Sequence, residues 1–377
     1  MTRLALLIRS LDYGGAERHL LTLSRALDKE RFSVTVLHFY PGGRLEDELK
    51  ASGVPVISLD KSGRWDVLRF SRKLVRQLRR IRPDVMHSFL VEPNLLTVFL
   101  KPLFPGARIV WGVRASRVHF EHYDWFARLN FRLQCFFSRF ADLIIFNSER
   151  GRAFHLAEGF PADRSLVIYN GIDTNRFKPD GEAGRELRAR LGVGADTPLV
   201  GHVGRLDPMK DHPTLLRAAA LVCRERGDVH FLCVGSGDDE DYSGGLRRLA
   251  TELGISDKVI WAGALSDMPA VYSALDLLVS SSFSEGFPNV IGEAMACGVP
   301  CVVTDTGDSA LIVGETGCVV EPRNPSALAG AIISLMEKDP QERGRRARAR
   351  ILENFSVERM TAETERAITA AASGETI

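Results

Sequence analysis

The sequence predicts an α/β protein made of two doubly wound domains in tandem, with a cleft between them. Three observations predict it. The chain has 377 residues, which is enough for two domains of ordinary size. Short apolar runs alternate with amphipathic helical stretches, the pattern of parallel strands joined by helices. This alternation stops in a polar segment rich in Gly, Asp and Pro, residues 171–197, and then begins again.

The first domain is expected to span residues 1–170. It contains seven apolar runs of strand length, separated by five stretches with helical periodicity. The predicted strands are residues 4–9, 32–38, 54–59, 85–88, 108–113, 143–146 and 166–169. The predicted helices are residues 16–27, 65–80, 94–103, 124–140 and 149–158.

The second domain is expected to span residues 198–355, after an inter-domain connection with one short helix. The predicted strands are residues 199–203, 229–234, 258–262, 277–280 and 300–304. The predicted helices are residues 214–226, 246–253, 268–274, 289–297 and 325–337. The last segment, residues 356–377, is helical in pattern but has no strand to follow. We expect it to cross back onto the first domain.

Composition and charge are those of a globular protein, with 45% hydrophobic and 26% charged residues. Residues 1–165 contain 27 Lys and Arg against 17 Asp and Glu, whereas the remainder contains 22 against 31. The basic half suggests an anionic acceptor or membrane surface, and we expect no nucleic-acid partner. Six scattered cysteines and no segment of transmembrane length indicate a cytoplasmic protein with reduced thiols.

Two glycines, Gly14 and Gly15, follow the first predicted strand and precede the first predicted helix. Glycines at this position let backbone amides approach a ligand closely, and the helix start adds positive potential. The pattern is not GxGxxG, so it does not indicate dinucleotide binding. The alternative is an ordinary turn between a strand and a helix, without a ligand.

Two cations follow the predicted strand 199–203. Arg205 and Lys210 lie in one loop, where they would converge on a diphosphate, the guanidinium as a planar fork and the ammonium as a point charge. The carboxyl end of a strand is where open α/β sheets bind ligands. The alternative is that both side chains are solvated and bind no ligand.

The stretch EGFPNVIGE, Glu285–Glu293, is the most informative part of the chain. Pro288 suits the first position of a helix, so two carboxylates bracket a helix start. Free amides at a helix start favour phosphate, and ionised carboxylates accept hydrogen bonds from hydroxyls. Phosphate between two sets of hydroxyls describes a nucleotide sugar. A capped turn with one exposed glutamate is the alternative.

Four motifs in order resemble one family. They are GGAE after the first strand, NGID at residues 170–173, GRL with a lysine five residues after the arginine, and E-x7-E. The chain resembles the retaining glycosyltransferases of group 1, also called family 4, across essentially its whole length. The resemblance implies the GT-B fold, in which two Rossmann-like domains face each other across a cleft.

The resemblance also implies roles for individual residues. Arg205 and Lys210 would neutralise the diphosphate in place of a metal ion, so neither a metal nor a cofactor is expected. Glu285 would contact the sugar hydroxyls and Glu293 the ribose hydroxyls. The donor-binding residues implied in this way are Gly14, Gly15, Gly204, Arg205, Lys210, Gly235, Leu265, Glu285, Gly286, Phe287, Pro288, Asn289, Val290, Ile291 and Glu293.

One position departs from the family pattern. Many members carry a histidine after the strand that we place at residues 108–113, whereas this chain has Arg114 there and His119 farther on. Arg114 would take the role of a positive group near the reacting sugar or the acceptor, so the implied catalytic residues are Arg205, Lys210, Glu285 and Arg114. A simple surface loop is the alternative for this segment.

Two stretches of the first domain suggest peripheral membrane association. Residues 65–82 combine a basic face with an apolar stripe, which fits either an interfacial helix or a helix packed on its own sheet. Residues 118–140 are aromatic and basic, with more apolar surface than one sheet-facing stripe needs. This stretch would dock to a bilayer or receive a lipid-linked acceptor.

The sequence therefore predicts a retaining, metal-independent hexosyltransferase that uses a nucleotide diphosphate sugar, with UDP favoured over GDP. The acceptor would be a saccharide or a lipid-linked saccharide in surface polysaccharide synthesis, bound mainly by the first domain. Two alternatives remain open. One is a nucleotide-sugar epimerase of the same fold, and the other is a nucleotide-sugar-binding protein without catalytic activity. The acidic run Asp238–Asp241 is expected to be a solvated loop and not a metal site.

Overall fold

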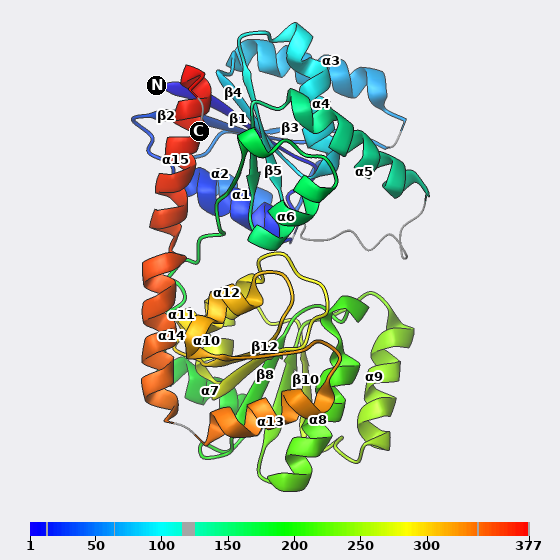
Figure 1. Ribbon diagram of the computed structural model, residues 1–377, viewed down its shortest axis with the longest axis vertical. Coiled ribbons are helices and arrows are strands. Elements are labelled where there is room, and N and C mark those ends of the chain that lie inside the picture. Colours follow the sequence, from blue (N-terminus) through cyan, green and yellow to red (C-terminus); the bar gives the residue numbers. More distant parts are fainter. Residues whose placement is uncertain (13, 64, 115–124, 338, 376–377) are drawn as a thin grey trace. The chain divides into compact units, whose positions relative to one another are not determined.

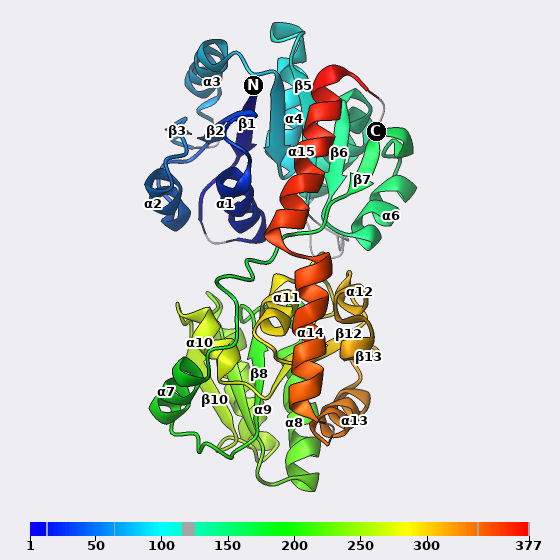
Figure 2. The same cartoon turned by 90° about the vertical axis from the view of Figure 1, so that its left-hand side faces the viewer.

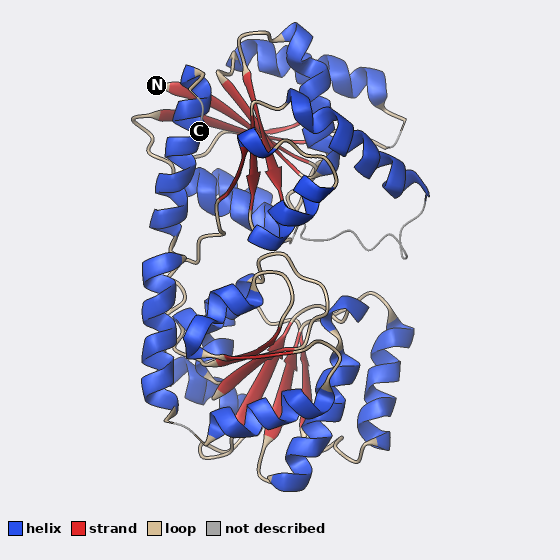
Figure 3. Ribbon diagram, in the orientation of Figure 1, coloured by secondary structure: helices blue, strands red, loops and turns tan. Residues whose placement is uncertain are grey.

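The computed structural model describes residues 1–377 except 13, 64, 115–124, 338 and 376–377, and only the backbone of residues 125–127 and 340. The chain divides into two compact units. The first unit contains Met1–Gly171 together with Val357–Ile377, and the second contains Ile172–Ser356. Each unit is a parallel sheet with helices on both faces (Figure 1, Figure 3). The predicted α/β class with two doubly wound domains is confirmed.

The first unit has a seven-stranded parallel sheet of order β3-β2-β1-β4-β5-β6-β7. Its strands are β1 (Thr2–Ile8), β2 (Phe32–His38), β3 (Val56–Ser58), β4 (Val85–Phe89), β5 (Arg108–Val113), β6 (Leu143–Phe146) and β7 (Ser165–Val167). Its helices are α1 (Gly15–Ala26), α2 (Arg44–Ala51), α3 (Val67–Ile81), α4 (Val91–Leu100), α5 (Trp125–Phe137), α6 (Glu149–Ala157) and α15 (Val357–Ser373), with short 3-10 turns η1 (Lys101–Leu103), η3 (Ser138–Phe140) and η4 (Ala162–Arg164).

Strand β1 is buried on both faces, as a central strand of such a sheet must be. Leu4, Leu6 and Ile8 pack with residues of α1, α2 and α15 on one face. Ala5 and Leu7 point to the other face, where they pack with residues of α3 and α4. Alternate residues of one apolar run therefore supply two separate cores.

The second unit has a six-stranded parallel sheet of order β10-β9-β8-β11-β12-β13. Its strands are β8 (Leu199–Val203), β9 (His230–Val234), β10 (Val259–Gly263), β11 (Leu277–Ser280), β12 (Cys301–Thr304) and β13 (Cys318–Val320). Its helices are α7 (Gly181–Leu191), α8 (His212–Glu225), α9 (Glu240–Glu252), α10 (Met268–Ser273), α11 (Asn289–Ala296), α12 (Ser309–Val313), α13 (Pro325–Met336) and α14 (Pro340–Asn354), with 3-10 turns η5 (Pro208–Lys210) and η6 (Gly314–Thr316).

Two sequence predictions are wrong in detail at helix starts. Asp238 and Asp239 lie in an exposed loop as expected, but Glu240 and Asp241 begin α9. Asp239 is the N-cap of this helix and accepts a hydrogen bond from the amide of Tyr242 at 2.9 Å. The two acidic residues after it lie in the first turn, where the helix dipole favours them. Pro288 is the N-cap of α11 and not its first helical residue.

Helix α15 packs along the first unit beside α1, far from it in sequence (Figure 2). Glu365 is 8% exposed. It accepts a hydrogen bond from the amide of Asp28 at 2.8 Å and pairs with Arg31, also at 2.8 Å. Apolar burial of Met360 and Ile368 accompanies these polar contacts. No helix among the described residues is both long and apolar enough to cross a membrane.

Buried histidines predict that acid destabilises the fold. Burial lowers the pKa of His155 to about 4, and that of His87 to about 3. The unfolded chain takes up a proton below its pKa of about 6.5, whereas each folded site does so only at lower pH. Between pH 6.5 and 4 we therefore expect the free energy of unfolding to fall by roughly 1.4 kcal/mol per pH unit for each histidine.

Urea denaturation at successive pH values measures this slope. In His155→Gln the slope should be smaller than in the unchanged protein by the contribution of one histidine. The glutamine amide retains a donor for the carbonyl of Gly151, which His155 Nδ1 contacts at 2.8 Å. Identical slopes in the two proteins would contradict the assignment.

Candidate active site

The order of the second sheet creates a topological switch point between β8 and β11. These strands are neighbours, although β9 and β10 come between them in the sequence. The connections that follow β8 and β11 lead to opposite edges of the sheet. Open α/β sheets bind ligands outside the carboxyl ends of the strands at such a point. The two loops that meet here are the ones that carry the predicted cations and carboxylates.

Lys210 and Glu285 meet at this switch point. The Lys210 Nζ atom lies 2.6 Å from Glu285 Oε1, and the two side chains are 21% and 13% exposed. Lys210 comes from η5 after β8, and Glu285 from the loop after β11. A largely buried ion pair contributes little net stability, because desolvation opposes the attraction. Such a pair in a ligand-binding crevice is a candidate for function.

Ser281 holds the backbone of Lys210 in place. Its hydroxyl donates to the carbonyl of Lys210 at 2.8 Å, and its oxygen lies 3.3 Å from His202 Nε2. Burial, with nearby His212 and Lys210, holds the pKa of His202 well below its usual range, so the ring is neutral. The amide of Phe283 also donates to Met209 at 3.0 Å. These bonds join the β8 and β11 loops, and the sequence analysis missed the role of Ser281.

Backbone hydrogen bonds donated by Gly204 and Gly235 join the carboxyl ends of β8, β9 and β10. The amide of Gly204 donates to Val234, and that of Gly235 to Gly263, at 2.9 and 2.8 Å. Gly235 has φ +143°, and a Cβ there would lie 1.9 Å from the carbonyl oxygen of Gly204. Only glycine permits this approach. Leu265, another predicted donor contact, follows in the next loop and is half-buried.

The start of α11 differs in part from the prediction. Ile291 is fully buried, and its amide donates to the carbonyl of Pro288 at 3.1 Å, so that amide belongs to the first helical turn. Phe287 is 6% exposed and packs against the ring of Phe355. The carbonyl of Gly286 accepts a hydrogen bond from the backbone amide of Asp308 at 2.9 Å. Asn289 and Val290 are half-buried.

Glu293 is oriented by Tyr272, a residue that the sequence analysis did not identify. The Tyr272 hydroxyl donates to Glu293 Oε2 at 2.7 Å, and the tyrosine is fully buried. Burial and the adjacent carboxylate raise the pKa of Tyr272 well above its usual range, which keeps it a donor. The contact fixes one carboxylate oxygen and thereby the direction of the other.

Tyr272→Phe tests this contact. Hydrogen bonds to charged groups are worth about 1.5–3 kcal/mol, so we expect the free energy of unfolding to fall by an amount in that range. The sequence analysis predicts that Glu293 binds the ribose of UDP, so affinity for UDP should then also fall, by roughly tenfold, because Glu293 loses its fixed orientation. Urea denaturation and calorimetry measure the two effects. Unchanged values of both would mean that the hydroxyl does not orient Glu293.

Arg205 and Lys210 contact different carboxylates and do not converge on one group. Its side chain is 75% exposed, and its guanidinium lies 3.4 Å from Asp207 Oδ2. Asp207 also caps η5 by accepting from the amide of Met209 at 2.9 Å. The Arg205 side chain is therefore free of packing that would hold it in one conformation, whereas the Lys210 side chain is held by its contact with Glu285.

Arg114 lies in a buried cluster at the carboxyl end of the first sheet. Its guanidinium donates to Asn170 Oδ1 at 3.0 Å and to His19 Nε2 at 2.6 Å. It also lies over the ring of Phe89, 5.4 Å from the centroid. Burial lowers the pKa of Arg114 to about 9, which still leaves it charged near pH 7. His119 lies outside the described residues.

The same cluster contains unsatisfied polar atoms. His19 Nδ1 and both ring nitrogens of His87 are buried and have no hydrogen-bond partner within the described ranges. Burial and the Arg114 charge hold the pKa of His19 well below its usual range. The first sheet has its own switch point between β1 and β4, and Gly14 and Gly15 follow β1. A Cβ on Gly15 would meet no described atom within 4 Å, whereas one on Gly14 would lie 2.1 Å from a carboxylate oxygen of Glu17.

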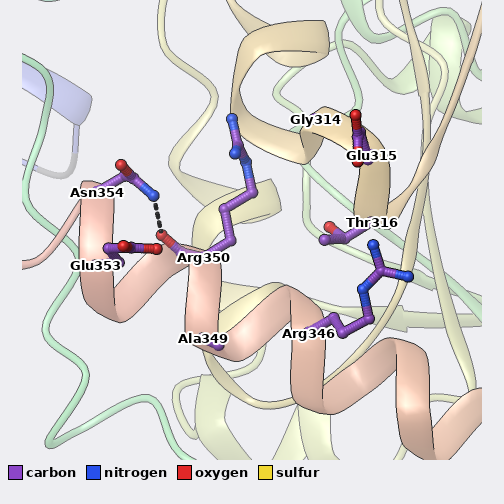
Figure 4. A pocket seen from close by; sticks show the side chains of 8 residues that line it. All are labelled: Gly314, Glu315, Thr316, Arg346, Ala349, Arg350, Glu353 and Asn354. Carbon is purple, nitrogen blue, oxygen red and sulfur yellow. Dashed lines mark hydrogen bonds between the residues drawn. The ribbon is translucent and has the colours of Figure 1, made fainter.

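A separate pocket in the second unit has a volume of about 520 Å³ and lies beside α14 (Figure 4). It is lined by Gly314, Glu315, Thr316, Arg346, Ala349, Arg350, Glu353 and Asn354, none of which is a predicted site residue. Arg350 donates to the carbonyls of Leu311 and Ile312 at 2.6 and 2.8 Å, so it secures the end of α12. Over the part of the chain that the structure describes, no three His, Cys, Asp or Glu side chains gather as metal ligands.

Two protein-family models match the chain. One, described as glycosyl transferases group 1, matches residues 197–338. The other, described as glycosyltransferase family 4, matches residues 13–176. Each therefore covers most of one half of the chain.

Known relatives agree with these matches. The Bacillus subtilis protein EpsF, named as a glycosyltransferase, is 26% identical over 309 residues, 79% of this chain and 78% of its own. A D-inositol 3-phosphate glycosyltransferase of Mycolicibacterium vanbaalenii is 34% identical over 224 residues, 55% of this chain and about half of that protein (48%). Anabaena HepE, solved in complex with UDP, is 25% identical, with a TM-score of 0.87 over 98% of this chain and 100% of its own. In its complex with UDP-glucose the TM-score is 0.86, at the same identity and coverage.

Proposed function

This chain belongs to the group 1 glycosyltransferases, also called family 4, and we propose that it transfers a hexose from a UDP-sugar to a saccharide or lipid-linked acceptor with retention of configuration. The observation that carries the proposal is the contact of Lys210 with Glu285 at the switch point of the second sheet. The complexes of Anabaena HepE with UDP and UDP-glucose favour UDP as the carrier.

Lys210 and Arg205 would bind the diphosphate from one loop. Lys210 exchanges its contact with Glu285 for a phosphate oxygen, and Arg205 swings from Asp207 to a second one. Glu285 is then free to accept hydrogen bonds from sugar hydroxyls, and Glu293, held by Tyr272, accepts from the ribose. These cations take the place that a metal ion has in other glycosyltransferases.

In the transfer, the bond between the anomeric carbon and the β-phosphate oxygen breaks, and its electron pair stays on the departing UDP. The acceptor hydroxyl oxygen forms the new bond to the anomeric carbon on the same face of the sugar, and its proton passes to the β-phosphate oxygen that leaves with UDP. Preorganised cations stabilise the negative charge as it develops on the leaving oxygen, with little reorganisation. Lys210 is the residue best placed for this, because Ser281 fixes its backbone.

The first unit would bind the acceptor. Arg114, buried yet charged, would lie near the reacting sugar or acceptor, where its field favours an anionic or hydroxyl-rich group. The buried nitrogens of His19 and His87 supply further polar atoms at the same end of the sheet. Surface polysaccharide synthesis is the process that this acceptor class suggests.

Incubation of the purified protein with UDP-hexoses, with and without saccharide acceptors, tests the proposal. We expect UDP release that depends on acceptor, and NMR of the product should show the anomeric configuration of the donor. Conversion of the donor sugar without acceptor would instead identify an epimerase. Tight UDP binding without turnover on any acceptor would identify a binding protein.

A further inference from the structure

Helix α5 and the turn η3 expose a row of apolar side chains. Leu129, Leu133, Phe136 and Phe140 are 43, 37, 51 and 50% exposed. Their spacings of four, three and four residues place them on one helix face. Helix α4 extends the row, because Phe99 is 59% exposed and contacts the ring of Phe137 at 4.9 Å. We call Phe99, Leu129, Leu133, Phe136 and Phe140 the α5 face.

The first unit does not need this face for its own core. The opposite side of α5 supplies the buried residues Phe131 and Gln134, which are 5% and 3% exposed. Helix α3 differs in part, since Phe70, Leu74 and Leu78 of its apolar stripe are buried against the sheet, whereas Leu68 in its first turn is 73% exposed. Of the two stretches that suggested membrane association, the apolar stripe of α3 is thus packed internally beyond its first turn. The outer face of α5 is left exposed.

Arginines border the α5 face. Arg128, Arg132 and Arg139 are exposed and immediately precede Leu129, Leu133 and Phe140. The guanidinium of Arg139 lies 4.4 Å from the centroid of the Phe136 ring, so its stem runs along the apolar row. Residues 125–141 contain no Asp or Glu. The face therefore combines apolar side chains with a positive border.

We propose that the α5 face docks on an anionic lipid surface. Leucine and phenylalanine side chains enter the boundary between headgroups and acyl chains, while the arginines contact lipid phosphates. A second copy of this chain fits less well, because a two-fold contact would bring the exposed arginines of the two copies together. This inference goes beyond the proposed sugar transfer and does not rest on it. It supplies a reason for a lipid-linked acceptor.

Vesicle flotation of the full chain tests the proposal. We expect binding to phosphatidylcholine vesicles that contain phosphatidylglycerol, little binding to phosphatidylcholine alone, and weakening by salt. Arg132→Ser should lower the partition coefficient roughly fivefold, the effect of about one basic residue near the surface. Phe136→Ser and Phe140→Ser should each lower it by about tenfold.

Two matched variants lie in the second unit. Arg190→Ser removes an exposed arginine of α7, and Leu352→Ser removes a 45% exposed leucine of α14; neither should change the partition. Equal binding to both vesicle types, or α5 variants that bind like the unchanged protein, would overturn the proposal. A dimer in solution that Phe136→Ser dissociates would assign the face to a second copy instead.

Thermal unfolding with and without UDP separates this inference from the proposed function. The α5 variants should keep the unfolding midpoint and its rise with UDP, since their side chains are exposed. A chain that binds anionic vesicles but gains no stability from UDP would refute the donor site and leave the α5 face intact.

Discussion

Replacing Lys210 with alanine is expected to lower kcat/KM for sugar transfer by about 10²- to 10³-fold. This is the usual effect of removing one preorganised group that stabilises charge in a transition state. The Lys210 side chain is 21% exposed and its Nζ atom lies 2.6 Å from Glu285 Oε1, so no other cation of the loop replaces it without rearrangement. Steady-state kinetics with a UDP-hexose measures the change.

The loss must be separated from a folding defect. Without Lys210, Glu285 loses its ion-pair partner at a position where its side chain is only 13% exposed, and we expect the free energy of unfolding to fall by about 1–3 kcal/mol. Circular dichroism at the assay temperature should still show a folded protein. Lys178→Ala, which removes an exposed lysine of the same unit, should change neither quantity. Equal kcat/KM for Lys210→Ala and the unchanged protein would refute the proposed role.

The strands were predictable because parallel sheets bury them on both faces, which produces short continuous apolar runs. Every predicted strand is present, with shifts of one or two residues at some ends. The edge strand β13 was missed, since it has three residues and Val319 is 41% exposed. Helices α2, α12 and α14 were missed as well. Helix α14 is mostly polar and basic, with few apolar positions to reveal its period.

The residue types of the candidate site could be seen in the sequence, but the contacts between them could not. Lys210 and Glu285 each follow a strand, and this much is visible in the sequence. Their contact depends on β8 lying beside β11, which are separated in the sequence by two strands. Tyr272 gave no signal, because a tyrosine in a short helix before a strand is usually a core residue. Ser281 stood among other small turn residues, so its hydrogen bond to the backbone of Lys210 depended on the fold.

Gly235→Ala is expected to damage the proposed donor site. At φ +143° a side chain is strained, and the new Cβ would lie 1.9 Å from the carbonyl oxygen of Gly204. Because backbone and not a flexible side chain occupies that space, the loop that leads to Lys210 must move. We expect the free energy of unfolding to fall by at least about 3 kcal/mol, and UDP to stabilise the remaining folded protein far less.

Gly254→Ala is the matched comparison. Gly254 also has a positive φ, +70°, but a Cβ there would meet no described atom within 4 Å. It should therefore cost only the left-handed backbone strain, about 1–2 kcal/mol, and leave the rise in unfolding midpoint with UDP unchanged. The difference between the two variants isolates the close approach of the β8 and β9 loops. If both variants lose the same stability and respond equally to UDP, the contact between Gly204 and Gly235 does not shape the donor site.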